Sequence, residues 1–301
     1  MWALLSACAT TPTAVDVESL TVRGQAFNAE DGSEVSPATF VEILREQRHI
    51  YVGERHREAL SHRTQLDVLE LLRSAKVPTA IAVEWLPVSA TEALSKYVAG
   101  EMTEQRMLEE VQWVRYWGHN VDAYRAILQF AQTHRIPIWP LNAPKGMARK
   151  VAMGQLDSLT EREKTAMTPL TSGNDAHRAY FFKLMARVSH AHGHGHGHRK
   201  APSLDAYYRA QLYRDEFMAK SLAEHLAKDT QGRVALVFAG RAHVAHGLGI
   251  PYRAAQLGWP GFSVVLPIAK AFSADTRATF GRTEYPKKQA DFLWLPTRRV
   301  R

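Results

Sequence analysis

Two short stretches of this chain share one pattern, in which an apolar run is followed by a glycine and then by a histidine three residues later. The first stretch is HIYVGERH, which ends at His56, and the second is VALVFAGRAH, which ends at His243. Apolar runs of this length are typical of strands that a sheet buries on both faces. In an open α/β sheet, ligands bind beyond the carboxyl ends of such strands. The repeat therefore predicts a fold that directs two imidazoles toward one site.

Other strand-like runs also end on polar side chains. The run at 79–84 ends on a carboxylate and the run at 136–142 ends on an amide, while a second carboxylate stands two residues before the first histidine. The carboxyl ends of parallel strands meet at one edge of a sheet, so these side chains are expected to form one polar cluster. Its members are Glu54, His56, Glu84, Asn142 and His243.

The order of strand-like and helix-like segments predicts an α/β fold with a mainly parallel central sheet flanked by helices. A hairpin is expected at about 20–35, and one further edge strand at 292–295. Helical periodicity predicts helices at 37–45, 59–75, 91–99, 103–113 and 121–134. Between 145 and 228 the pattern is helical throughout, which indicates a long all-helical insertion.

These patterns divide the chain into four parts. They are an anchor and tether (1–19), the first part of the α/β core (20–144), the helical insertion (145–232), and the second part of the core with a basic tail (233–301).

A histidine-rich segment, 189–198, lies inside the predicted insertion. Its imidazoles alternate with glycine or alanine, and glycine at this density opposes helix formation, so a flexible loop is expected. Such a loop could bind Zn, Cu or Ni, or it could simply be a solvated low-complexity segment. The histidines are His190, His192, His194, His196 and His198.

The formal net charge is +8. The basic residues are scattered and form no recognisable nucleic-acid-binding module, so no nucleic-acid partner is expected. No run of 18 or more apolar residues occurs, so the body of the protein is not expected to span a bilayer. Any membrane association would then come from a lipid anchor alone.

Cys8 is the single cysteine, which excludes an intramolecular disulfide. The sequence Leu5-Ser6-Ala7-Cys8 looks like a bacterial lipobox, although the segment before it is shorter than a signal peptide. A start codon placed too late or a trimmed chain would explain this, and a chance cysteine in a tail is the alternative. If Cys8 is lipidated, Ala9 after it favours the outer membrane, with the protein facing the periplasm or the cell surface.

Several motifs together resemble the ChaN-like haem-binding lipoproteins of the Tiki, TraB and erythromycin-esterase-like superfamily. They are GERH at 53–56 with His62 and Gln65, Glu84-Trp85, Asn142, the segment YRAQLYRDEFMA at 208–219, GRAH at 240–243, and GLGIP at 247–251.

This resemblance implies a lipid-anchored protein of bacterial haem and iron uptake, in which two protomers hold haem and a tyrosine binds the iron. Tyr207, Tyr208 and Tyr213 lie on the signature segment, and Tyr180 is another option, although tyrosines at helical spacing often pack in a core. Asn142 and His62 are further candidates for the haem site.

Two other functions remain open from the sequence. Hydrolases of the same superfamily suggest a metal-dependent hydrolase in which His56, Glu84 and His243 hold Zn, Mn or Co and activate a water. Without a metal, His56 with Glu54 or Glu84 could act as a general base and its orienting carboxylate. The third reading is a scavenger of divalent metals that works through the histidine-rich loop.

His62 and Gln65 are three residues apart, so both face one side of the helix that follows the first core strand. The turn after that strand can bring His62 back toward the crevice. We therefore expect His62 to belong to the polar site rather than to the surface.

Overall fold

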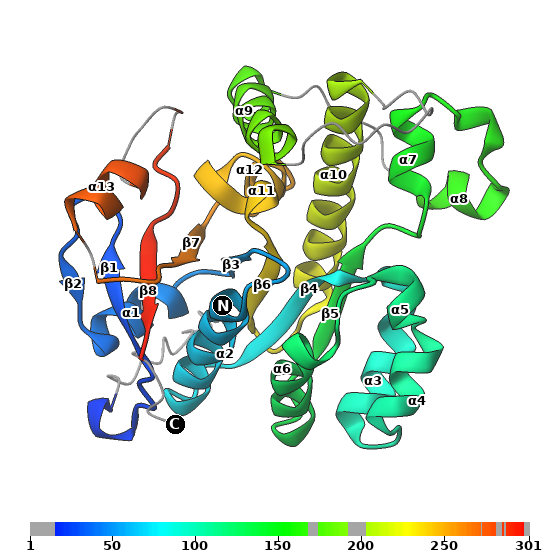
Figure 1. The fold of residues 1–301 in the computed structure, drawn as a ribbon. Coiled ribbons are helices and arrows are strands. Elements are labelled where there is room, and N and C mark those ends of the chain that lie inside the picture. Colours follow the sequence, from blue (N-terminus) through cyan, green and yellow to red (C-terminus); the bar gives the residue numbers. More distant parts are fainter. Residues whose placement is uncertain are drawn as a thin grey trace, which may run out of the picture.

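The computed structural model describes residues 16–167, 174–191, 203–271, 273–280, 285 and 287–297. Its centre is one eight-stranded sheet with strand order β2-β1-β8-β7-β3-β6-β4-β5 (Figure 1). The strands are β1 (Gly24–Asn28), β2 (Glu34–Val35), β3 (His49–Glu54), β4 (Thr79–Pro87), β5 (Ile138–Asn142), β6 (Val234–Gly240), β7 (Phe262–Pro267) and β8 (Phe292–Pro296).

The predicted fold class is confirmed. The strands from β8 to β5 in this order pair in parallel, and the hairpin of β1 and β2 adds an antiparallel margin. The prediction that the run at 292–295 forms an edge strand is wrong, because β8 pairs with β7 on one side and with β1 on the other. The hairpin therefore occupies the edge that the sequence pattern assigned to β8.

The predicted helices of the first half are largely present. Ser36 caps α1, where its side chain accepts a hydrogen bond from the backbone of Thr39, and Pro37 takes the first helical position. The single helix predicted at 103–113 is wrong, because Gln112 adopts a left-handed φ of 53° and separates two helices. The helices of this half are α1 (Pro37–Arg45), α2 (Ala59–Ser74), α3 (Thr91–Ala99), α4 (Glu104–Glu110), α5 (Trp113–Tyr116) and α6 (Asp122–Thr133).

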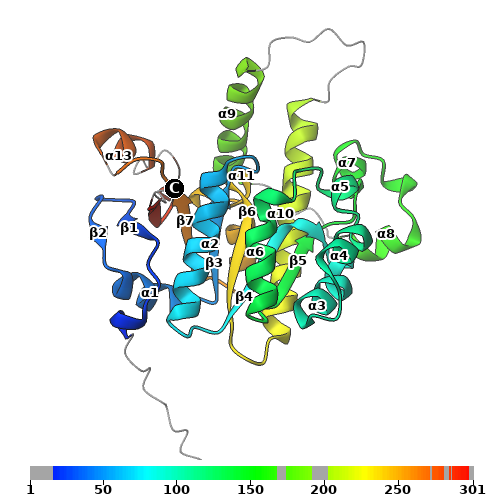
Figure 2. The same ribbon diagram turned by 60° about the horizontal axis from the view of Figure 1, so that its bottom comes forward.

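Helices cover both faces of the sheet (Figures 1 and 2). Successive strand residues point to opposite faces, so Ile50 and Val52 pack with the residues of α1, α2, α3 and α6, whereas Tyr51 packs with those of α10 and α12. The sheet is buried on both sides, which explains why its central strands read as unbroken apolar runs.

The predicted insertion contains α7 (Met147–Ala152), α8 (Glu161–Ala166), α9 (Asp175–Ala191) and α10 (Leu204–Lys228). The second half of α10 packs directly on the sheet, since Met218 and Leu222 share a core cluster with Ala82 and Val237. This half of α10 is thus the crossover helix between β5 and β6, while the boundaries of the insertion remain a prediction.

The histidine-rich segment was expected to be a loop from residue 189 onward, but α9 continues to Ala191. Residues 192–198, and Cys8 with the tether as far as residue 15, lie outside the described residues, whereas the end of the predicted tether forms a short 3-10 helix at Val17–Ser19. Among the residues that are described, no helix is both long and apolar enough to cross a membrane.

After β6 the chain forms α11 (Arg241–Val244) and α12 (Ile250–Gln256), and α13 (Ala274–Phe280) follows β7. Gly249 makes the tight return between α11 and α12 possible, because a Cβ at this position would lie 2.1 Å from the carbonyl oxygen of His243. The GLGIP motif therefore fixes the backbone that carries the second repeated histidine.

Candidate functional site

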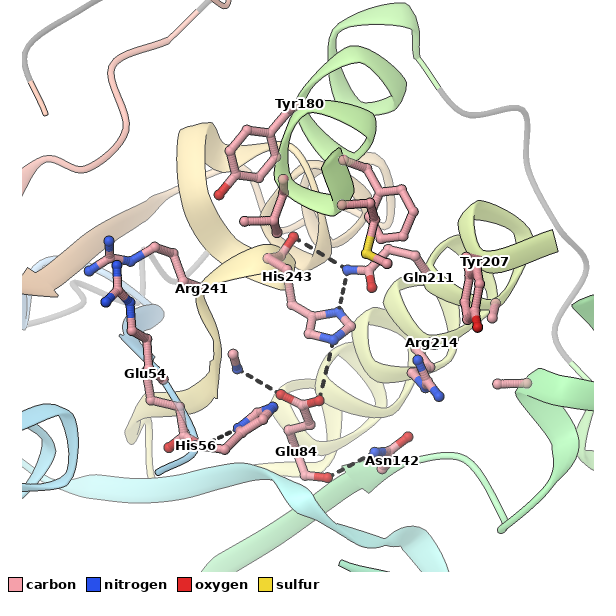
Figure 3. A pocket seen from close by; sticks show the side chains of 18 of the residues that line it. Glu54, His56, Glu84, Asn142, Tyr180, Tyr207, Gln211, Arg214, Arg241 and His243 are labelled. Carbon is pink, nitrogen blue, oxygen red and sulfur yellow. Dashed lines mark hydrogen bonds and ion pairs between the residues drawn. The ribbon is translucent and has the colours of Figure 1, made fainter. Parts of the chain in front are cut away.

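A cavity of about 1620 Å³ opens at the carboxyl edge of the sheet, between the ends of β3, β4, β5 and β6 and the helices α7, α9 and α10 (Figure 3). Parallel register explains its floor, because Glu54 at the end of β3 pairs with Gly240 at the end of β6. All five members of the polar cluster predicted from the strand ends line this cavity. They are Glu54, His56, Glu84, Asn142 and His243.

The first unit of the site is the pair of Glu54 and His56. The Nδ1 atom of His56 lies 2.7 Å from Oε1 of Glu54, whose side chain is fully buried. Burial opposes the charge of His56, but the carboxylates of Glu54 and Glu84 outweigh it and raise the pKa of the imidazole above its usual value. With Nδ1–H held by Glu54, the Nε2 atom is the one available for proton transfer.

A second layer of side chains fixes this pair. The Gln65 amide donates a hydrogen bond of 2.7 Å to Oε2 of Glu54. His62 is buried, and its Nε2 lies 3.1 Å from the carbonyl oxygen of His56, which also accepts a hydrogen bond of 3.1 Å from the Tyr124 hydroxyl. The predicted position of His62 within the polar site is confirmed. Its side chain supports His56 from behind and does not line the cavity.

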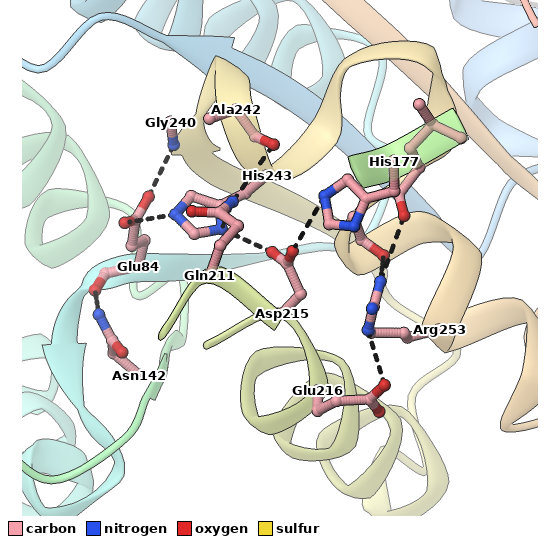
Figure 4. Close-up of polar contacts among 12 residues, drawn as sticks. Glu84, Asn142, His177, Gln211, Asp215, Glu216, Gly240, Ala242, His243 and Arg253 are labelled. Atoms are coloured by element: carbon pink, nitrogen blue, oxygen red, sulfur yellow. Dashed lines mark hydrogen bonds and ion pairs between the residues drawn. The ribbon is translucent and has the colours of Figure 1, made fainter. Parts of the chain in front are cut away.

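The second unit is a buried ion triad around His243 (Figure 4). Its Nε2 lies 3.3 Å from Oε1 of Glu84, and its Nδ1 lies 2.6 Å from Oδ1 of Asp215. Burial alone would lower the pKa of His243, but Glu84 and Asp215 together raise it to about 10. His243 is therefore an imidazolium at neutral pH.

Glu84 is held in its charged form by the same arrangement. Its burial would raise the pKa, but His243, His56 and the backbone N–H of Gly240, which donates to Oε2 at 2.7 Å, together hold the pKa well below its usual range. The Asn142 amide donates a hydrogen bond of 2.9 Å to the backbone carbonyl of Glu84. Asn142 thus positions the strand end that carries the carboxylate.

Helix α10 supplies the far side of the triad. Gln211 and Asp215 are four residues apart, so both face the sheet edge. The Gln211 amide lies 2.9 Å from Nδ1 of His243 and donates to the carbonyl of Ala242 at 3.3 Å. Beyond Asp215, the fully buried His177 places Nε2 3.5 Å from Oδ2. A line of charged and polar groups thus extends from the cavity into the protein interior.

The predicted metal site of His56, Glu84 and His243 finds no support. Within the described parts of the chain, no group of three or more histidine, cysteine or acidic side chains has the geometry to hold a metal ion. Both nitrogens of His243 already face carboxylate oxygens, at 3.3 Å and 2.6 Å, so the imidazole is engaged in the ion triad. Zn, Mn and Co are therefore not supported in this site. Of the loop histidines, His190 lies in α9, and His192, His194, His196 and His198 lie outside the described residues.

Aromatic and cationic side chains form the cavity walls. Of the tyrosines predicted as haem ligands, Tyr207 lines the cavity with 42% of its surface exposed, and Tyr180 also lines it. The structure does not bring Tyr208 and Tyr213 to the cavity. Tyr208 packs against Phe181 and Leu212, and Tyr213 is fully buried. The cations on the walls are Arg55, Lys145, Arg149, Lys183, Arg214 and Arg241.

Sequence reasoning missed several residues of this site. Trp117 and His119, from the loop after α5, place their ring centroids 4.8 Å and 5.3 Å from that of His56. These two residues lie between the helices predicted at 103–113 and 121–134, and no strand-end pattern marks them. Asp215 belongs to the signature segment, yet spacing along one helix does not show which residue on another element it contacts.

The site and fold define a class of protein: a mainly parallel α/β sheet, covered by helices on both faces, with a large cavity that has aromatic and cationic walls at its carboxyl edge. The model of the family described as "Haem-binding uptake, Tiki superfamily, ChaN" matches residues 40–254. The chain belongs to this family. The comparison with curated proteins gives no match.

Three solved structures are similar to this chain, and the first of them shares the fold. ChaN of Campylobacter jejuni, described with cofacial haem binding, is similar with a TM-score of 0.66 and 15% identity over 92% of this chain and 98% of that one. The C-terminal region of Pasteurella multocida toxin gives 0.45 and 14% over 79% and 25%. A mutant of the erythromycin esterase EreC gives 0.44 and 12% over 92% and 83%. The last two TM-scores are too low to extend the assignment.

Proposed function

We propose that this protein binds haem in the cavity at the carboxyl edge of its sheet. The observation that carries the proposal is the combination of family membership with a cavity that has aromatic walls, several cations and an accessible tyrosine. Its volume of about 1620 Å³ exceeds the roughly 300–1,000 Å³ of pockets for ordinary small ligands. A large planar cofactor is therefore a suitable occupant.

The residues present fit the chemistry of haem. The rings of Tyr180, Phe181 and Tyr207 offer apolar faces for the porphyrin, and arginine and lysine side chains can pair with its two propionates. A tyrosine oxygen is an established axial ligand for haem iron, and Tyr207 has the exposed hydroxyl-bearing side chain for this role. Bound haem would supply a coordinated iron, while the protein supplies orientation and charge.

Haemin titrated into the full chain should give a saturable Soret shift at near-stoichiometric ratio. Tyr207→Phe should remove the phenolate-to-iron charge-transfer band and weaken binding by about tenfold or more, since one iron–ligand contact is lost. Tyr208→Phe is the matched control, because this neighbour on α10 is buried away from the cavity. A slow, non-saturating absorbance like that of aggregated haem would contradict haem binding, and an unchanged spectrum of Tyr207→Phe would exclude this ligand only.

We further propose that the protein acts in haem or iron uptake, that Cys8 is lipidated, and that the anchor holds it at the outer membrane, facing the periplasm or the cell surface. The family description and the lipobox-like sequence support this. A homodimer that encloses haem is part of the same proposal. In cells, Cys8→Ser should move the protein from the membrane to the soluble fraction, and haemin should shift its sedimentation toward a dimer.

The second candidate function is hydrolysis by acid–base chemistry, and the observation that favours it is the geometry of His56. Its Nδ1 is held by the buried Glu54, and 33% of its side chain is exposed to the cavity. This is the arrangement of a general base with its orienting carboxylate. Haem binding does not by itself require it.

If the site hydrolyses esters or amides, His56→Ala should lower the rate by roughly 10²–10⁴. A panel of chromogenic esters, phosphoesters and amides, with the exposed His134→Ala as control, tests this. Activity that is absent from the wild-type protein, or that survives in His56→Ala, would exclude His56 catalysis.

A further inference from the structure

Each of the two repeated segments carries an arginine beside its histidine. Arg55 precedes His56, and Arg241 follows Gly240. The parallel pairing of β3 with β6 places the two segments side by side, and both arginines line the cavity. Neither the polar cluster nor the ion triad uses them. The repeat therefore delivers a pair of guanidinium groups as well as a pair of imidazoles.

The two guanidinium groups lie close enough to repel each other. Partial burial and the charge of Arg55 together lower the pKa of Arg241, and only Tyr180 and Glu58 act in the opposite direction. Like charges at a cavity wall cost free energy unless an anion lies between them. The free protein thus keeps an unfavourable arrangement that an anionic ligand would relieve.

Protein groups provide little compensation for these charges. Arg241 has no ion pair within the described residues, and its buried Nε has no hydrogen-bond partner there. Its guanidinium lies 5.4 Å from the ring centre of Phe280, which orients it without neutralising it. Arg55 lies 3.9 Å from Glu58, but this pair is exposed and contributes little.

Cationic side chains also lie on the opposite side of the cavity. They differ from the arginines of the repeat in position and in burial. Arg149 lies on α7 and Arg214 on α10, and both are exposed. Arg241 is the more buried group, and it sits at the sheet edge beside Tyr180 (Figure 3). A planar guanidinium with free N–H groups in a partly desolvated position recognises a carboxylate in bidentate fashion.

We propose that Arg55 and Arg241 form an anion subsite that binds a carboxylate of the ligand in the cavity. This inference rests on the proposed function, in which that carboxylate is one haem propionate. The other side of the cavity would then face the remainder of the cofactor. The subsite assigns a fixed orientation to the ligand, because one end is held at the junction of β3 and β6.

Affinity for haemin and for haemin dimethyl ester, in which both carboxylates are masked, tests the subsite. Arg241→Gln should weaken haemin binding by about tenfold and leave binding of the dimethyl ester unchanged, since one charge-assisted contact is lost. Arg57→Gln is the control, because this exposed arginine carries the same charge nearby but does not line the cavity. Equal weakening of both ligands, or none in Arg241→Gln, would overturn the inference.

A second measurement does not depend on haem. At constant ionic strength, glutarate should raise the Tm of the wild-type protein above its value in chloride, and Arg241→Gln should abolish this shift. A shift that persists in Arg241→Gln, or no shift in the wild type, contradicts the subsite. Stabilisation by inorganic phosphate but not by glutarate would overturn the assignment of a carboxylate. If haemin does not bind while glutarate does, the proposed function fails and the subsite stands.

Discussion

Replacing Asp215 with alanine should lower the free energy of unfolding by about 3–5 kcal/mol, the range for breaking a buried ion pair by removal of one partner. Asp215 is fully buried, and its Oδ1 lies 2.6 Å from Nδ1 of the His243 imidazolium (Figure 4). The variant would leave this charge with Glu84 alone and would remove the acid that faces His177. Urea unfolding at pH 7 measures the loss.

Two variants separate charge from packing in this experiment. Asp205→Ala lies on the same helix, but its ion pair with Arg178 is exposed, so it should cost at most about 1 kcal/mol. Asp215→Asn keeps the shape and one hydrogen-bond acceptor, and its loss should lie between the other two. If Asp215→Ala costs no more than Asp205→Ala, the triad does not stabilise the fold and His243 is not charged as described.

The part of the site that follows strand ends could be predicted from the sequence. Apolar runs identified β3, β4, β5 and β6, and parallel pairing then brought Glu54, His56, Glu84 and His243 to one edge. Register in a buried sheet leaves little freedom, because a slip of one residue would exchange its two faces. Residues that are far apart along the chain could therefore be placed together from the pattern of apolar runs.

The rest of the site depends on contacts that no local pattern encodes. The partner of His243 on α10 is Asp215, 28 residues before it, and the rings over His56 come from a loop that follows a left-handed Gln112. The metal prediction is not supported, for a related reason. Histidine and glutamate at strand ends suit a metal or an ion pair equally well. In the structure a second carboxylate, that of Asp215, faces the other nitrogen of His243, and this arrangement is an ion pair.

Stability should depend on pH because two buried histidines remain neutral. Burial lowers the pKa of His49 to about 4, with a smaller effect from the charge of Arg48, although a hydrogen bond from Nε2 to the Trp259 carbonyl opposes it. Burial also lowers the pKa of His177 to about 4, although Asp215 opposes this. The unfolded chain binds protons at both positions below about pH 6.5, whereas the folded chain does so only near pH 4.

The two neutral histidines therefore make their full contribution to the free energy of unfolding above about pH 6.5. This contribution is lost as the pH falls toward 4, by about 3 kcal/mol for each histidine. His243 acts in the opposite direction: because its folded pKa is about 10, its contribution is complete below about pH 6.5 and is lost as the pH rises toward 10. The free energy of unfolding should thus be highest near pH 6.5.

Urea unfolding between pH 4.5 and 9 measures how the free energy of unfolding depends on pH. His49→Gln should flatten its acid side, whereas the exposed His134→Gln should leave it unchanged. An acid side that is flat in the wild-type protein would mean that His49 and His177 accept protons in the folded state, and hence that water reaches them.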